Sequence, residues 1–160
     1  MNQLTFKFPF KTNYYEEDFY VSSNNFEAYK LIESWPNWPS RFVNIFGPSG
    51  CGKTHLSTIL KKKLNSFFTI ASELNDNNFI NIKSKECLII DDYNNNIEEK
   101  LLYTVLNQCL QSNQYVITNS IKPIKKIPIE LIDLRSRLES FTDIGIDLPT
   151  DDLIRVILTK

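Results

Sequence analysis

Apolar, β-branched and aromatic residues form short runs along the chain, and most of the segments between these runs carry apolar residues at helical spacing. Buried strands are predicted over residues 41–46, 67–70, 87–90, 115–119 and 142–146. Helices are predicted over residues 26–33, from Lys53 onward, and over 97–110. Strands that alternate with helices pair in parallel, because a parallel connection needs a crossover of helical length. The pattern therefore predicts a wound α/β fold.

The two ends of the chain have patterns of their own. Residues 1–10 alternate apolar and polar positions, which predicts an extended segment ahead of the domain. From residue 149, a proline, a threonine and two aspartates form a helix-start signal, and apolar residues at helical spacing follow. We therefore expect an extended segment over 1–10, a core over 11–148, and the first helix of a further module over 149–160.

The segment between the first core strand and the next helix concentrates glycine. Three of the chain's four glycines, Gly47, Gly50 and Gly52, stand in the pattern Gly-x-x-x-x-Gly-Lys-Thr. Glycine adopts positive φ and lets backbone N–H groups approach a ligand, and the helix that starts near Lys53 directs its positive end to the same place. We expect positive φ at all three glycines and a nest for phosphate oxygens. The alternative is a glycine turn with an incidental lysine.

The side chains that follow the glycines suit a nucleoside triphosphate. The Lys53 ammonium can reach the β- and γ-phosphates, and the Thr54 hydroxyl is placed to ligate Mg²⁺. The residues of this loop predicted to bind the nucleotide are Gly47, Pro48, Ser49, Gly50, Cys51, Gly52, Lys53, Thr54 and His55. For His55, the only histidine, the sequence places no carboxylate nearby, which favours a packing or surface role over a catalytic one.

A second polar signature follows about forty residues later. The apolar run that begins at Cys87 ends in two carboxylates, Asp91 and Asp92. Ligands of open parallel sheets bind at the carboxyl ends of the strands, so Asp91 is predicted to lie beside the phosphate loop and hold Mg²⁺. Asp92 is the candidate to orient or deprotonate an attacking water. The alternative is that these aspartates cap the helix that follows.

Composition narrows the class of protein. With 160 residues, 42% of them hydrophobic, the chain should form one domain with a substantial hydrophobic core. Its net charge of −1 lacks the excess of basic residues that is typical of nucleic-acid-binding domains. Its three cysteines, Cys51, Cys87 and Cys109, lack metal-ligand spacing and should be reduced packing residues. We find no leader and no apolar run of membrane-spanning length, and we expect a cytoplasmic protein without membrane contact.

These motifs, in this order, resemble the DnaA/Hda family of AAA+ ATPases along essentially the whole chain. Residues 47–56 resemble the Walker A motif of the family and residues 89–92 its Walker B motif. Residues 116–120 resemble the strand that ends in sensor 1, which implies a catalytic role for Asn119. The resemblance implies a P-loop NTPase fold, a three-layer αβα arrangement around a five-stranded parallel sheet, with ADP or ATP and Mg²⁺ as cofactors.

Two further segments extend the resemblance. Residues 18–25 look like the segment that cups adenine in this family, which implies nucleotide contacts from Phe19, Val21 and Asn24. The segment over 131–138 is similar to the arginine-finger motif, which implies that Arg137 reaches the γ-phosphate of a neighbouring protomer. A guanidinium suits that role because it is planar, always charged and able to meet phosphate oxygens bidentately. The alternative for this arginine is an ordinary surface position.

The N-terminus resembles the peptide with which the Hda branch, called HdaA in alphaproteobacteria, binds the DNA polymerase sliding clamp. Gln3 would supply a paired amide, and Leu4, Phe6 and Phe8 would supply apolar anchors for a pocket. Here phenylalanines replace aliphatic residues of the family pattern, and Lys7 replaces a proline. The alternative is an edge strand of the chain's own fold.

Resemblance to the Hda branch implies a regulator of replication initiation that docks on the clamp and presents Arg137 to DnaA–ATP, so that DnaA hydrolyses its nucleotide. We expect no sequence-specific DNA binding. The family normally has a small helical lid, and residues 149–160 look like the start of its first helix, so we expect a lid that is absent or truncated. The motifs leave two alternatives open. One is an autonomous ATPase, such as a helicase loader, in which a second copy in a homo-oligomer supplies Arg137. The other is a nucleotide-gated adaptor that promotes no hydrolysis.

Overall fold

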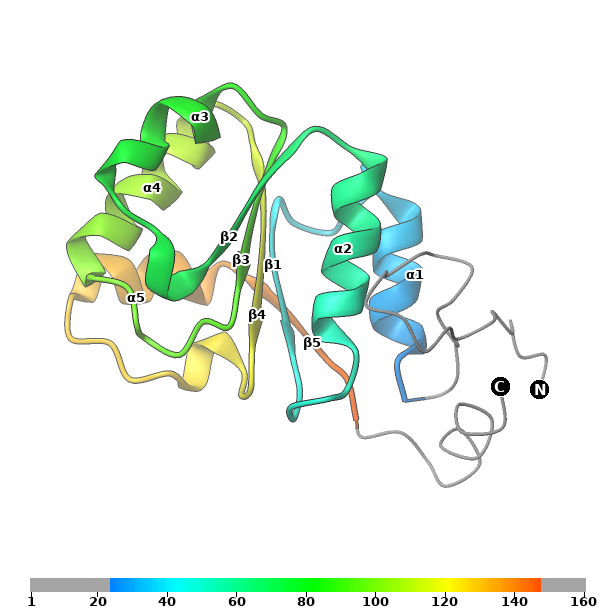
Figure 1. Ribbon diagram of the computed structural model, residues 1–160. Helices are drawn as coiled ribbons and strands as arrows, with labels where there is room; N and C mark the ends of the chain where they lie inside the picture. Colours follow the sequence, from blue (N-terminus) through cyan, green and yellow to red (C-terminus); the bar gives the residue numbers. More distant parts are fainter. Residues whose placement is uncertain (1–23, 148–160) are drawn as a thin grey trace.

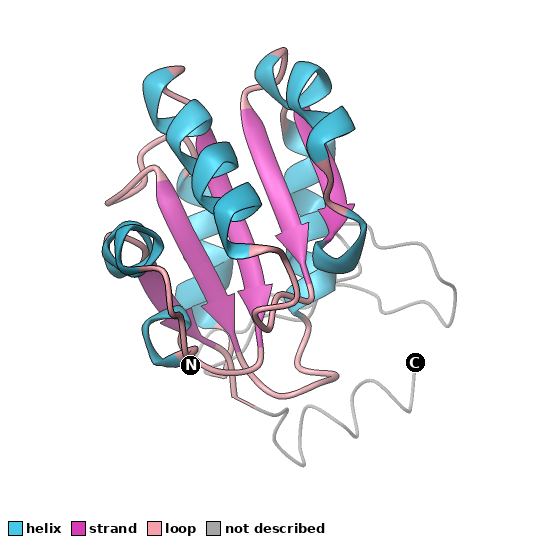
Figure 2. Cartoon of the chain, turned by 90° about the vertical axis from the view of Figure 1, so that its left-hand side faces the viewer, coloured by secondary structure: helices cyan, strands magenta, loops and turns pink. Residues whose placement is uncertain are grey.

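Five parallel strands form one sheet in the computed structural model, which describes residues 24–147. The strands are β1 (Phe42–Phe46), β2 (Ser66–Ile70), β3 (Cys87–Asp91), β4 (Tyr115–Ser120) and β5 (Thr142–Gly145). Their order across the sheet is β2-β3-β4-β1-β5, and every neighbouring pair is parallel. The arrowheads in Figure 2 accordingly point in one direction. The predicted five-stranded parallel sheet is confirmed, with each strand end within one residue of its expected position.

Helices cover both faces of the sheet and give the three layers that were predicted (Figure 1). The helices α1 (Phe26–Ser34) and α2 (Lys53–Lys63) lie on one face. The other face carries α3 (Phe79–Lys83), α4 (Glu99–Gln111) and α5 (Ile132–Glu139). Three short 3₁₀ turns complete the described elements: η2 (Ala71–Glu73), η3 (Asp76–Asn78) and η4 (Ile124–Lys126). No described helix combines the length and the apolarity that a bilayer span requires.

Alternation along the central strands divides the core into two clusters. On β3, Leu88 and Ile90 pack against α4 and α5, whereas Cys87 and Ile89 pack on the side of α1 and α2. Because both faces of a central parallel strand are covered, the strand reads as a continuous apolar run. Each fully buried leucine or isoleucine stabilises the fold by about 1.5–3 kcal/mol. The central strands are thereby held rigidly, and their carboxyl ends provide a firm base for a site.

The order of the strands determines where that site lies. The chain leaves β1 through α2 on one face of the sheet, and it leaves β4 through α5 on the other face. The strands β1 and β4 are neighbours, so their connections diverge and open a crevice beyond their carboxyl ends. In open α/β sheets ligands bind in this crevice. The glycine-rich loop follows β1 and therefore lies at its edge.

Candidate functional site

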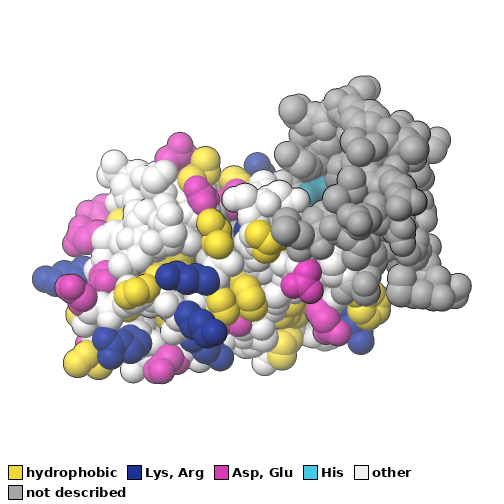
Figure 3. Space-filling view, turned by 90° about the horizontal axis from the view of Figure 1, so that it is seen from below, with side chains coloured by type: hydrophobic (Ala, Val, Ile, Leu, Met, Phe, Trp, Pro, Cys, Tyr) yellow, Lys and Arg dark blue, Asp and Glu magenta, His cyan; other side chains and the backbone are white. Residues whose placement is uncertain are grey.

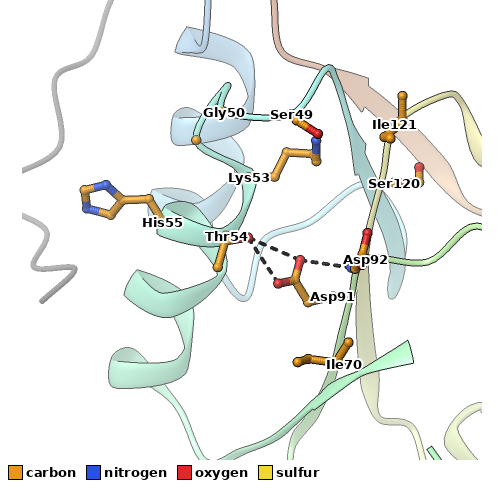
Figure 4. Close-up of a pocket in the computed structure, with 11 residues that line it drawn as sticks. Ser49, Gly50, Lys53, Thr54, His55, Ile70, Asp91, Asp92, Ser120 and Ile121 are labelled. Atoms are coloured by element: carbon orange, nitrogen blue, oxygen red, sulfur yellow. Dashed lines mark hydrogen bonds between the residues drawn. The ribbon is translucent and has the colours of Figure 1, made fainter. Parts of the chain in front are cut away.

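A cavity of about 470 Å³ lies at the carboxyl ends of the strands. Figure 4 shows the glycine-rich loop and the start of α2 on one side and the ends of β3 and β4 on the other. The residues that line it are Ser49, Gly50, Gly52, Lys53, Thr54, His55, Ile70, Asp91, Asp92, Ser120 and Ile121. The fold thus brings the two polar signatures of the sequence, about forty residues apart, into one cavity.

The three loop glycines serve two different purposes. Gly50 and Gly52 have φ values of +82° and +105°, so they adopt the left-handed conformations that were predicted. The prediction of a positive φ at Gly47 is wrong. A Cβ atom on Gly47 would lie 2.3 Å from the carbonyl oxygen of Ile146 and 2.8 Å from Sγ of Cys51. Glycine is required there because another segment of backbone passes too close for a side chain.

Lys53 is folded back over the loop in which it lies. Its ammonium donates to the carbonyl oxygen of Gly47 and, at 3.2 Å, to that of Pro48, and it lies 3.8 Å from Sγ of Cys51. An ammonium group has three donors and no acceptor, so it binds whatever oxygens are presented to it. Phosphate oxygens offer the same acceptor chemistry with a full negative charge. The ammonium of Lys53 could therefore exchange these carbonyl oxygens for phosphate oxygens.

Thr54 and Asp91 meet directly across the cavity. The Thr54 hydroxyl donates to the Asp91 carboxylate, at 3.1 Å to Oδ2 and 3.3 Å to Oδ1 (Figure 4). Hydroxyl and carboxylate oxygens are the ligands that Mg²⁺ prefers. Within residues 24–147 no group of three or more histidine, cysteine, aspartate or glutamate residues could hold a metal ion. The donor set fits a Mg²⁺ ion that takes its remaining ligands from water and from phosphate oxygens.

Asp92 has a backbone conformation that is rare for a residue with a side chain. Its φ is +57°, and its N–H donates to Oδ1 of Asp91 at 3.0 Å while its carbonyl accepts from Asn96 at 3.1 Å. Such positions cluster at functional sites, where the surrounding contacts hold them. The alternative role of helix capping is wrong for both aspartates, because Glu98 is the N-cap residue of α4 and makes no side-chain capping bond. Asp92 is instead an exposed carboxylate that lines the cavity.

Asn119 lies behind Asp91 and is fully buried. Its side-chain amide donates to Oδ1 of Asp91 at 3.0 Å and to Oγ of Ser57 at 2.7 Å. Sequence reasoning found Asn119 but missed Ser57. The available signal was the spacing from Thr54, because residues three apart lie on the same face of a helix.

Ile70 and Ile121 are two further lining residues that sequence reasoning missed. They are 39% and 59% exposed, and in Figure 4 they lie on either side of the two aspartates. Ile70 ends β2 and pairs in register with Asp91, whereas Ile121 directly follows β4. The signal that could have found them is their position at the carboxyl end of a strand. Figure 3 shows hydrophobic, basic and acidic side chains interspersed on this end of the molecule.

Three other predicted residues either lie outside the cavity or point away from its aspartates. Arg137 is half-buried in the last turn of α5 and does not line the cavity. The helix leads into the start of β5, so this arginine lies toward the edge of the sheet where the strands begin. The side chain of Asn24 donates to the carbonyl of Asp147 at 3.1 Å. His55 is buried, and its ring points away from Asp91 (Figure 4).

Several predictions fall outside the described residues. These are the partner-binding set Gln3, Leu4, Phe6 and Phe8, the nucleotide contacts Phe19 and Val21, and the helix over 149–160. The roles assigned to these residues, and the domain boundaries at 10/11 and 148/149, stay predictions.

Comparison with protein families gives one match. Residues 43–129, which include the glycine-rich loop, both aspartates and Asn119, match the model of a family described as RNA helicase. No curated protein matches the sequence.

Comparison with solved structures identifies proteins with a similar fold. A DNA replication initiation factor superposes with a TM-score of 0.76 at 21% identity, covering 93% of this chain and 54% of that one. The replication initiator DnaA bound to AMPPCP and single-stranded DNA has a TM-score of 0.73 at 23% identity, covering 87% of this chain and 51% of that one. Domain III of DnaA from Thermotoga maritima has a TM-score of 0.76 at 21% identity, covering 94% and 74%. The chain spans about half the length of the first two structures, and it has the P-loop NTPase fold of the third.

Proposed function

The chain belongs to the RNA helicase family, and from the geometry of its cavity we propose that it binds an adenine nucleotide together with Mg²⁺. The observation that carries the proposal is the meeting of Lys53, Thr54 and the two strand-end aspartates around one cavity. A volume of about 470 Å³ lies within the range of small-molecule sites. The adenine specificity rests on the resemblance of residues 18–25 to the segment that cups adenine in the DnaA/Hda family.

Each side chain has a defined task in this proposal. The loop N–H groups and the Lys53 ammonium bind phosphate oxygens, and the Thr54 hydroxyl and the Asp91 carboxylate hold the metal ion. Bound Mg²⁺ would neutralise charge that develops on the phosphate oxygens. Asp92 is free to orient a water molecule and to accept its proton.

A binding measurement tests the proposal directly. Isothermal titration calorimetry with ATP and with ADP, each in the presence of Mg²⁺, should give saturable binding to the parent protein. Lys53→Ala should weaken binding of both nucleotides at least about tenfold, because a charged partner of the phosphates is lost. Lys63→Ala, at the far end of the same helix, is the matched control. An absence of heat with the parent protein would contradict the proposal.

We further propose that the protein regulates replication initiation, as the resemblance to the Hda branch implies. In this proposal residues 3–8 dock on the sliding clamp and Arg137 stimulates hydrolysis of DnaA-bound ATP. The support is the sequence pattern, together with the position of Arg137 outside the cavity of its own chain. The lifetime of DnaA–ATP should shorten with the parent protein and clamped DNA, and should be unchanged with Arg137→Ala.

The family match favours a second candidate, an ATPase that acts on nucleic acid or loads a helicase. In that case this chain would hydrolyse ATP itself, with Asp92 as base and Arg137 supplied by a second copy. Steady-state ATPase measurements separate the two. Vigorous hydrolysis that is stimulated by single-stranded RNA or DNA, and unaffected by DnaA and the clamp, would favour this candidate over the regulator.

A further inference from the structure

Three hydrogen bonds link four side chains between α2 and the sheet. Thr54 donates to Asp91, and the Asn119 amide donates both to Asp91 at 3.0 Å and to Ser57 at 2.7 Å. Thr54 and Ser57, at the two ends of this chain of bonds, lie one turn apart on α2.

The alternation of side chains along the strands explains why these four residues meet. Ile89 and Ile117 face the cluster beneath α1 and α2, so Asp91 and Asn119, two residues further on, face the same side. There they meet the two helix hydroxyls. Ser57 and Asn119 are both 0% exposed, which makes their contact a buried one.

The hydrogen-bonding capacity of Asn119 determines the direction of its amide. An ionised carboxylate only accepts, so the amide NH₂ group must face Asp91. That group has two N–H donors, and Asp91 and Ser57 take one each. Oδ1 of Asn119 is buried without a partner in the described part of the chain. The side-chain amide is therefore held only by the two hydrogen bonds that its NH₂ group donates, and the Ser57 hydroxyl accepts one of them.

We propose that Ser57 is a positioning residue: its hydroxyl fixes the Asn119 amide so that one N–H lies on Asp91, and it thereby orients the carboxylate that Thr54 also contacts. The Asp91 carboxylate accepts from the Thr54 hydroxyl, from the backbone N–H of Asp92 and from the Asn119 amide, and Ser57 sets the last of these. The consequence for metal binding rests on the proposed function, whereas the orientation of the amide does not.

Removal of the hydroxyl should act on the metal-dependent part of nucleotide binding. In Ser57→Ala one amide N–H loses its buried acceptor, so the amide turns and Asp91 loses one of the three donors that orient it. Partners that orient a metal ligand typically change metal affinity about 10- to 100-fold. The affinity for ATP should therefore fall about tenfold in the presence of Mg²⁺ and remain near that of the parent in EDTA.

Matched variants separate this effect from general damage to the helix. Among the described residues, the hydroxyl lost in Thr58→Ala donates only to the helix carbonyl of Thr54, at 2.8 Å. The affinity of this variant with Mg²⁺ should equal that of the parent. If Ser57 acts through Asn119, Ser57→Ala should have no further effect in an Asn119→Ala background. Equal losses in Mg²⁺ and in EDTA, or additive losses in the double variant, would overturn the proposal.

A measurement without nucleotide distinguishes failure of this proposal from failure of the proposed function. The side-chain amide signals of Asn119 can be assigned in ¹⁵N-labelled protein by their loss in Asn119→Ala. They should shift in Ser57→Ala and stay in place in Thr58→Ala. Signals that do not move in Ser57→Ala would reject the positioning role even if nucleotide binds. A parent protein that binds no nucleotide, with signals that shift as expected, would reject only the proposed function.

Discussion

The Thr54 hydroxyl on α2 donates to the carboxylate of Asp91 at the end of β3, with 3.1 Å between Oγ1 and Oδ2. The contact joins two residues that lie in separate sequence motifs. Thr54 follows the glycine loop, and Asp91 ends a buried strand two positions away from β1 in the sheet. Both groups offer hard oxygen ligands, so one divalent ion could bridge them.

Asp91→Asn should weaken nucleotide binding only where Mg²⁺ contributes. An amide keeps the size of the carboxylate but lacks its charge, so the affinity for ATP with Mg²⁺ should fall at least about tenfold while the affinity in EDTA stays the same. Calorimetric titration with ATP in Mg²⁺ and with ATP in EDTA measures the two affinities. Glu73→Gln, an exposed carboxylate that follows β2, serves as the control. Equal affinities of Asp91→Asn and parent protein in Mg²⁺ would show that this carboxylate holds no metal.

Alanine at the loop glycines should separate steric from conformational demands. At Gly50 no atom would lie within 4 Å of a new Cβ. Gly50→Ala should therefore lower the free energy of unfolding only by the cost of a positive φ for alanine, about 1–2 kcal/mol. At Gly47 the new Cβ would collide with backbone, and the loss should be larger because the segment around Ile146 must move. Urea unfolding measures both. A Gly47→Ala variant as stable as Gly50→Ala would contradict the steric explanation.

Folded-state burial should protect two of the cysteines from modification. Cys87 and Cys109 are fully buried, and burial raises the pKa of the Cys109 thiol to about 12 and that of Cys87 still further. The thiolate is the reactive form, so neither should react with a thiol reagent at pH 8 until the protein unfolds. Mass spectrometry after timed alkylation, with and without urea, identifies the labelled positions. Rapid labelling of Cys109 in the native protein would contradict this placement.

The parts of the structure that were predicted correctly depend on local pattern. Central parallel strands such as β3 are covered on both faces, so burial itself imposes a continuous apolar run on their sequence. The glycine-rich loop was recognisable because its geometry demands glycine at fixed spacing, and Gly50 and Gly52 adopt positive φ. These features need only neighbouring residues.

What could not be predicted depends on contacts between distant segments. The steric requirement at Gly47 comes from the carbonyl of Ile146, at the other end of the described chain. The role of Ser57 depends on an amide that arrives from β4. The short helix α3 and the 3₁₀ turns η2 and η3 lie in a segment too short and too polar for a periodic signal. The position of β1 between β4 and β5 likewise follows from crossovers, which no local pattern encodes.

Glu99 ties the beginnings of two helices together and should make stability depend on pH. Its carboxylate accepts from the N–H of Leu131 at 2.8 Å and from that of Glu130 at 3.2 Å, just before α5. These bonds, with that of Leu131 the largest, hold the pKa of Glu99 below its ordinary value. A lowered pKa means that the folded protein favours the ionised form more strongly than the unfolded chain does.

The ionised form of Glu99 therefore contributes its full stabilisation above the ordinary glutamate pKa of about 4.3. This contribution is lost as the pH falls through the lower pKa that Glu99 has in the folded protein. Glu99→Gln should lower the urea midpoint at pH 7, and the difference from the parent should shrink toward pH 3. The neighbouring Glu98 makes no side-chain hydrogen bond within residues 24–147, so Glu98→Gln should leave the midpoint unchanged across this range. A gap between Glu99→Gln and the parent that stays constant from pH 7 to pH 3 would mean that the charge of Glu99 does not stabilise the start of α5.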